Sequence, residues 1–254
     1  MINLLRMELF KLGKNKMFWT LTIIVTVVFA LLHYLITIEW WKMNNIFMDA
    51  GLEMFSSLAL ATTPFYFMLY LSTLTGFFVA NDFTIGVVKN IVMSGNRRSH
   101  IFAAKLLILA LGSSILALVC PLLVTIGGKL LFGFGAMTDP SALGYLARAL
   151  CLFLIHMMAL VALLMLIALL VEDSGKTIII SVVIALLISV AEVLRPLPGI
   201  LETLYRYSIF HHLIDSFRIR MTYTDVIQSL GVGVGTILIL VFCGNLVFKR
   251  KEIK

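Results

Sequence analysis

Charged residues and glycines at fixed spacing interrupt an otherwise apolar chain between residues 82 and 105. The positions that stand out are Asp82, Gly86, Lys89, Asn90, Gly95, Arg98 and Lys105. A membrane protein needs few charges between two apolar segments unless a partner on that side recognises them. We therefore interpret this segment as a docking element whose chemistry is charge recognition and not catalysis.

The pattern around the two glycines is that of a short amphipathic helix. Ile85, Val88 and Val92 share one helical face, and Lys89 and Asn90 lie on the other side. The glycines near either end allow tight turns into and out of the helix. Such a helix lies across a membrane surface and fits a groove on a soluble partner. The alternative is a basic loop that only fixes the orientation in the membrane.

Ionisable residues also occur inside or beside the apolar segments. His156, Glu192 and His33 could each line a polar cavity. Equally, Glu192 and His33 could reach the lipid headgroups, and His156 could make a hydrogen bond between helices. His211 and Asp215 are four residues apart and would share a helix face, but the sequence shows no third ligand for a metal.

One tetrapeptide resembles the end of a phosphate-binding P-loop, from Ser174 to Thr177. The motif requires a glycine five residues before Gly175, and this chain has Leu170 there. It also requires a preceding strand, and the preceding segment is an apolar helix. We therefore interpret the tetrapeptide as a tight turn between two membrane helices. Neither a His-Glu-x-x-His nor a Gly-x-Ser-x-Gly motif occurs in the chain.

The composition shows which elements must position these residues. Of the 254 residues, 61% are hydrophobic and 13% are charged, and the apolar residues form blocks long enough to cross a bilayer. We expect an all-α polytopic membrane protein, a single domain over residues 1–254. The predicted spans are about 17–38, 55–80, 102–126, 144–171, 177–194 and 228–248. The three cysteines fall inside these blocks and indicate neither a disulfide framework nor a metal site.

Six spans place both ends of the chain on one side of the membrane. That side carries 13 of the 20 lysines and arginines, whereas eight of the 13 acidic residues lie opposite. The positive-inside rule therefore places both ends and the 81–101 loop in the cytoplasm. Orientation and anionic lipid account for the net charge of +7, so nucleic acid is not needed as a partner.

Two further segments are amphipathic. In residues 1–16, one helical face carries Leu4, Leu5, Leu9 and Leu12, with the cations off that face. This pattern predicts a helix in the cytoplasmic interface, and the alternative is a simple topology anchor. Residues 196–225, between the last two spans, predict one or two short helices at the outer leaflet.

The spacing Asp82-x3-Gly86-x2-Lys89-Asn90-x4-Gly95-x2-Arg98-x6-Lys105 resembles the signature of type-2 ABC exporter permeases. The resemblance implies six spans, an N-terminal elbow helix at 1–16, a coupling helix at 82–98 and short outer helices at 196–225. It also implies that the signature residues dock a separate ATPase subunit, which binds ATP and Mg²⁺. The permease would act as a dimer, most simply two copies with two ATPases.

The resemblance is less specific about the substrate and the location of the protein. Small separate permeases of this kind resemble those that export amphipathic peptides such as toxins, bacteriocins and peptide antibiotics. That implies a multi-pass protein of the bacterial plasma membrane. The alternatives are an exporter of lipid, drug or ion, or a membrane-embedded enzyme or assembly factor. Whether the permease dimer is homo- or heteromeric stays open.

Overall fold

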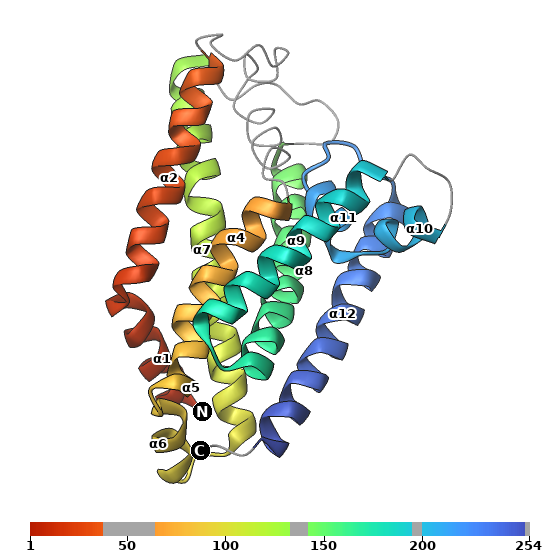
Figure 1. The fold of residues 1–254 in the computed structure, drawn as a ribbon. Helices are drawn as coiled ribbons and strands as arrows, with labels where there is room; N and C mark the ends of the chain where they lie inside the picture. Colours follow the sequence, from red (N-terminus) through yellow and green to blue (C-terminus); the bar gives the residue numbers. More distant parts are fainter. Residues whose placement is uncertain (38–63, 133–141, 195–199, 252–254) are drawn as a thin grey trace.

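The computed structural model describes residues 1–37, 64–132, 142–194 and 200–251, and within these ranges every regular element is helical (Figure 1). The predicted all-α class is therefore confirmed for the described part of the chain. Residues 55–63 of the predicted 55–80 span and residues 196–199 of the 196–225 segment lie outside it.

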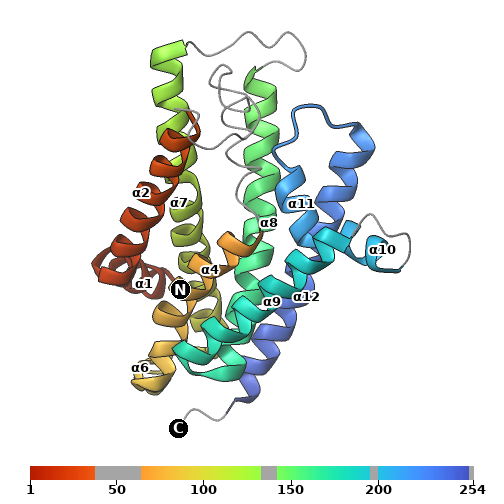
Figure 2. The ribbon, with the colours of Figure 1, turned by 45° about the horizontal axis from the view of Figure 1, so that its top comes forward.

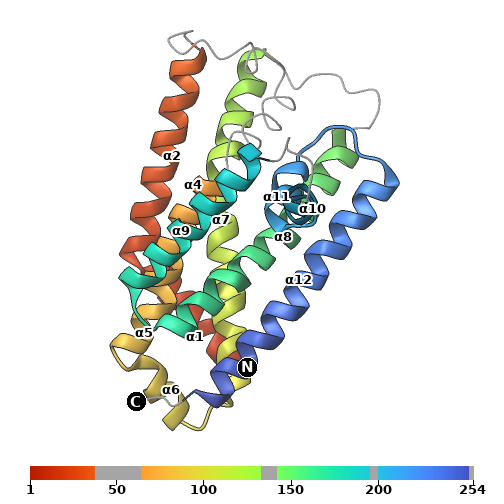
Figure 3. The ribbon, with the colours of Figure 1, turned by 45° about the vertical axis from the view of Figure 1, so that its right-hand side comes forward.

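The helices follow one another with short connections. They are α1 (Ile2–Lys14), α2 (Lys16–Thr37), α4 (Pro64–Thr75), the π-helical turn η1 (Gly76–Ala80), α5 (Asn81–Thr84), α6 (Val87–Met93), α7 (Arg98–Phe132), α8 (Ala142–Val171), α9 (Ser174–Leu194), α10 (Ile200–Arg206), α11 (Ile209–Asp215) and α12 (Tyr223–Arg250). The long helices form one bundle. The N-terminus, α6 and the last turn of α12 lie at the same end of it, and α10 and α11 lie in the other half (Figures 1 and 3).

Length and hydropathy decide which described helices could cross a membrane. Four qualify, with apolar stretches Arg98–Val119, Gly144–Val171, Ser174–Glu192 and Tyr223–Arg250. Met68–Thr84 together with Val87–Met93 would make a fifth, but the two parts are bent by 62°. The apolar run described for α2 is shorter, Lys16–Val28. The last four predicted spans are thus matched by helices, and the count of six stays a prediction.

Helix α8 lies between α7 and α12 (Figure 2). Two apolar clusters hold the bundle together, and α8 contributes to both. One includes Met68, Leu71, Tyr145, Phe153, Leu160 and Leu213. The other, at the α6 end, includes Leu74, Phe78, Val88, Ile101, Leu109 and Phe248. Small residues let α12 approach closely, because a Cβ at Gly233 would lie 2.6 Å from Cγ2 of Ile155 on α8. Close packing through small residues is typical of helices in membranes, where the hydrophobic effect gives little drive for association.

One expectation about local structure was wrong, and another gains detail. Of the predicted leucine face of α1, Leu4 and Leu12 are buried together with Glu8, because a spacing of four residues directs these side chains toward the bundle, whereas Leu9 is exposed. The P-loop-like tetrapeptide is the first turn of α9 and not a connecting turn. The connection is Glu172 and Asp173, and Asp173 Oδ1 accepts the backbone N–H of Lys176 at 2.8 Å.

Candidate functional site

Helix α6 is set off from its neighbours by two glycines. Gly86 has φ 73° and Gly95 has φ 83°, a left-handed conformation that glycine adopts at little cost. Between them α6 buries Val88 and Ile91 against the bundle. Lys89 and Asn90 are exposed on the opposite side. The short amphipathic helix and its two glycine turns are therefore present as predicted, with its polar face open to a partner.

The apolar face of this helix differs from the prediction at one position. Ile85 is 61% exposed, because it lies in the turn before Gly86 and outside the helical register. At the other end of α6, Met93 is 70% exposed. The open surface of the helix thus combines a lysine and an asparagine with two apolar side chains. We call Ile85, Lys89, Asn90 and Met93 the α6 surface.

Two signature residues are buried in an ion cluster behind α6. Asp82, Lys105 and Glu8 are each 1% exposed. Lys105 Nζ lies 2.7 Å from Glu8 Oε1 and also pairs with Asp82. Lys11 pairs with the same Asp82 carboxylate and donates to the carbonyl of Phe78 at 3.0 Å. The cluster therefore joins α1, α5 and α7, and neither Asp82 nor Lys105 can touch a partner protein in this conformation.

The electrostatics of the cluster are balanced but costly. Two carboxylates and two ammonium groups offset one another, which buried charges require. Burial lowers the pKa of Lys11 below its ordinary value of 10.5, and the nearby charge of Lys105 lowers it further, whereas Asp82 opposes the shift. Glu8 was not among the residues predicted from the sequence. Its signal was an acidic residue spaced four residues from both Leu4 and Leu12 in a segment otherwise free of acidic residues.

A third signature residue, Arg98, is bound to the chain's own backbone. Its Nη1 donates to the carbonyl oxygens of Lys249 at 2.9 Å and Lys251 at 2.5 Å. These carbonyls end α12, where no further turn supplies N–H donors, and a cation there also suits the negative end of the helix dipole. Arg98 thus fixes the end of α12 beside the start of α7.

A model of the ABC-2 family of transporter proteins matches residues 4–192, which is more than half of the chain. The chain belongs to the ABC-2 transporter family. A search of curated proteins found no match. The protein is accordingly the membrane component of an ABC transporter, and permeases of this type generally work with an ATPase subunit.

The ionisable residues predicted as possible cavity lining in this ABC-2 permease differ in their surroundings. His156 is fully buried, and its Nε2 lies 2.8 Å from Ser229 Oγ on α12. Its ring stacks on that of His212 in α11, with centroids 5.6 Å apart and planes 11° apart. The interhelical hydrogen bond was one of the two interpretations of His156. Glu192 is half-buried near the end of α9, and the side chain of His33 lies outside the described residues.

The pair His211 and Asp215 has other partners. His211 packs on Tyr205 with centroids 5.6 Å apart, and the Asp215 carboxylate lies 3.4 Å from Arg218. No group of three or more His, Cys, Asp or Glu in the described ranges could hold a metal ion. Of the neighbouring residues, His212 is buried in α11, and this burial lowers its pKa from 6.5.

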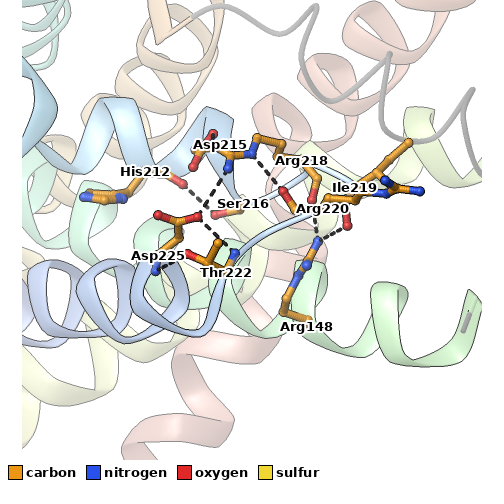
Figure 4. Close-up of polar contacts among 9 residues, drawn as sticks. All are labelled: Arg148, His212, Asp215, Ser216, Arg218, Ile219, Arg220, Thr222 and Asp225. Atoms are coloured by element: carbon orange, nitrogen blue, oxygen red, sulfur yellow. Dashed lines mark hydrogen bonds and ion pairs between the residues drawn. The ribbon is translucent and has the colours of Figure 1, made fainter. Parts of the chain in front are cut away.

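A polar network fixes the connection from α11 to α12 in the ABC-2 permease (Figure 4). Arg148 on α8 donates to the backbone carbonyls of Arg218 and, at 3.0 Å, Ile219. Arg218 in turn pairs with Asp225 at 3.2 Å. Asp225 and Thr222 form a capping box that starts α12. Sequence reasoning did not find this role of Arg148, because its partners are backbone atoms about 70 residues away.

Proposed function

We propose that this chain is the permease subunit of an ATP-driven exporter, with α6 as its coupling helix and α1 as its elbow helix. The observation that carries the proposal is the two-sidedness of α6. Val88 and Ile91 anchor the helix in the bundle, while Lys89 and Asn90 are free to meet another protein. A helix held rigidly on one face can pass a push from a partner into the bundle.

The signature residues divide into three roles in this proposal. Lys89 and Asn90 contact the ATPase, with the exposed Ile85 and Met93 beside them. Gly86 and Gly95 shape the turns that present the helix. Asp82, Arg98 and Lys105 do not dock directly but position α6 against α1, α7 and α12. ATP and Mg²⁺ are bound by the ATPase, and the energy enters this chain as movement of α6.

The buried ion cluster supports a role for α1 in the same movement. Glu8 and Lys11 on α1 hold Lys105 and Asp82, so a displacement of α5 and α6 also displaces α1. A separated ion pair would leave buried charges without partners, which is strongly unfavourable. The two helices therefore respond to the ATPase as one unit.

Charge and family support the proposed membrane setting. The protein spans the plasma membrane of a bacterial cell, and the end that carries α6 faces the cytoplasm. The excess of lysine and arginine at that end supports this orientation. Two permease copies with two ATPases make the working transporter. The substrate is a hydrophobic or amphipathic peptide, and lipid, drug or ion substrates are the alternatives.

The docking role is tested by co-purification from detergent. An ABC ATPase should accompany the wild-type chain, and Lys89→Glu should weaken its binding at least about tenfold, or about 1.4 kcal/mol. Lys176→Glu is the matched control, because Lys176 is an exposed lysine at the same end of the bundle. Equal recovery of the ATPase with both variants would show that α6 is not the docking site.

The substrate is tested by stimulation of ATP hydrolysis. The purified complex in nanodiscs should hydrolyse ATP faster with amphipathic peptides than with phospholipid, sodium ions or a lipophilic drug at matched concentrations. Stimulation by one of the other three would reassign the substrate. Transport or turnover of a substrate without any ATPase would instead support a membrane enzyme or assembly factor.

A further inference from the structure

We propose that Glu172, in the turn between α8 and α9, is a positioning residue that couples α6 to α12. The proposal rests on the proposed function, in which α6 receives the push of the ATPase. The new elements are α12, as the helix that receives the movement of α6, and Glu172, as the residue that links the two helices. α12 lies outside the region that matches the family, residues 4–192, so the link comes from the contacts of this chain.

The backbone of Glu172 is the first sign of a special role. Its φ is 56°, and among the described residues it is the only one other than glycine with positive φ. A side chain with a Cβ is disfavoured in this conformation. Glycine would fit the turn more easily, so the glutamate side chain must contribute something that glycine cannot.

Glu172 connects two distant parts of the chain. Its carbonyl accepts a hydrogen bond from Thr84 Oγ1 at 3.0 Å, and Thr84 is the last residue of α5 before the turn into α6. Its carboxylate pairs with Lys251 Nζ at 2.7 Å, just beyond α12. The same Lys251 ammonium donates to the carbonyl of Leu169 in the last turn of α8. The turn is therefore bound to α5 on one side and to the end of α12 on the other.

Apolar packing reinforces the same three-way joint. The ring of Phe83 in α5 meets the ring of Phe248 in α12 edge to face, with centroids 6.1 Å apart. The ammonium of Lys251 lies 5.5 Å from the centroid of Phe83. Phe248 is fully buried. A movement of α5 therefore displaces the last turn of α12 directly as well as through Glu172.

The turn between α8 and α9 is also bound to η1. Ser174 Oγ donates to the carbonyl of Gly76 at 2.8 Å, which fixes the start of α9 to the π-helical turn η1. A π-helical turn is a local departure from regular geometry and is common where helices must adjust. The segment 76–84 and the α8–α9 turn thus move together, and Lys251 and Phe248 pass the movement to α12.

The first test uses the purified permease without any ATPase. Thr84→Val removes the hydrogen bond to Glu172, and none of the interactions described above joins Thr84 to α12. We expect amide hydrogen exchange in residues 247–250 to become about two- to tenfold faster, the range for losing one net hydrogen bond. Thr84→Ser keeps the hydroxyl and should exchange like the wild type. Unchanged exchange in Thr84→Val would overturn the proposal.

A thermodynamic cycle separates coupling from general loosening. Glu172→Gln and Lys251→Gln keep the size of each side chain, and the double variant should exchange in residues 247–250 no faster than the faster single variant. Additive effects of the two changes would contradict the link. Circular dichroism establishes that each variant is folded. If Thr84→Val does not fold, Glu172→Gln replaces it in the exchange measurement, because it is the mildest change.

The second test uses the complex with the co-purified ATPase. Spin labels at Ser94, the exposed residue that ends α6 outside the α6 surface, and at Lys249, which is also exposed, report the separation of α6 and the end of α12. With ATP and Mg²⁺ added, α12 should follow α6 in the wild type and lag behind it in Glu172→Gln, while ATPase recovery stays equal. The same response in both proteins would refute the coupling role. If no ATPase co-purifies, the proposed function fails, and the exchange measurements still decide whether the joint exists.

Discussion

Replacing Lys105 with methionine should strongly destabilise this protein. Lys105 is the cation that pairs with Glu8, and both side chains are 1% exposed. Without Lys105, the Glu8 carboxylate would stay buried without a cation, whereas Asp82 would keep Lys11. Breaking a buried ion pair from one side costs about 3–5 kcal/mol, and we expect Lys105→Met to lower the free energy of unfolding by that amount.

The double variant Glu8→Gln/Lys105→Met makes the prediction specific. It removes one negative and one positive charge, so the remaining pair of Asp82 and Lys11 is balanced. The cost then falls to lost hydrogen bonds and packing, about 1–3 kcal/mol. The double variant should therefore be more stable than Lys105→Met alone, although it carries one more substitution.

The measurement is reversible unfolding in an SDS titration, followed by circular dichroism of the purified permease in mixed micelles. Lys89→Met serves as the control, because it removes an exposed lysine from the same region and should change the free energy of unfolding by about 0.5 kcal/mol or less. A double variant that is no more stable than Lys105→Met would refute the reasoning, since burial of an unpaired carboxylate would not be the source of the loss.

Other substitutions test packing, turn geometry and protonation. Gly233→Ala should cost about 1–3 kcal/mol in the same titration, because its Cβ would lie 2.6 Å from a side chain of α8, whereas Gly235→Ala meets open space and should be neutral or slightly stabilising. Equal effects would contradict the close approach of α12. Gly86→Ala forces a residue with a Cβ to φ 73° at about 1–2 kcal/mol and should reduce ATPase recovery; undiminished recovery would show that this turn does not present α6. Burial, and then the neighbouring His211, lower the pKa of His212 below 6.5. Just below pH 6.5 the unfolded chain therefore binds a proton at this histidine, whereas the folded chain does not. Stability should consequently fall as the pH drops from 6.5 toward the folded pKa, and His212→Gln should flatten this dependence in unfolding measured from pH 8 to pH 5; an unchanged slope would assign it to other groups.

The local features of α6 and its two flanking turns were predictable from the sequence. The spacing of Val88 and Val92, the exposed Lys89 and the turns at Gly86 and Gly95 depend on neighbours within a few residues. A helix repeats every 3.6 residues, and glycine tolerates positive φ wherever it occurs, so short-range patterns suffice. The placement of Ile85 on the apolar face was wrong, because the turn before Gly86 shifts the helical register and a count of apolar spacing does not detect such a shift.

The roles of the charged residues were not predictable in this way. Asp82, Arg98 and Lys105 have the composition of a docking surface, yet their partners are Glu8 and Lys11 on α1 and the backbone at the end of α12. Those partners are up to 153 residues away in the chain. Whether a charge is exposed or buried depends on which segments pack together, and spacing within one segment carries no information about that.

The sequence by itself determined that this chain is helical and embedded in a membrane, and which loop carries its basic helix. Apolar blocks long enough for a bilayer permit little else, because backbone groups in lipid must bond within their own helix. The tertiary structure alone decided which of the signature charges face outward. It leaves Lys89 open, buries Asp82 and Lys105 against α1, and fixes Arg98 on α12, because each buried charge needs a partner that only the folded bundle supplies.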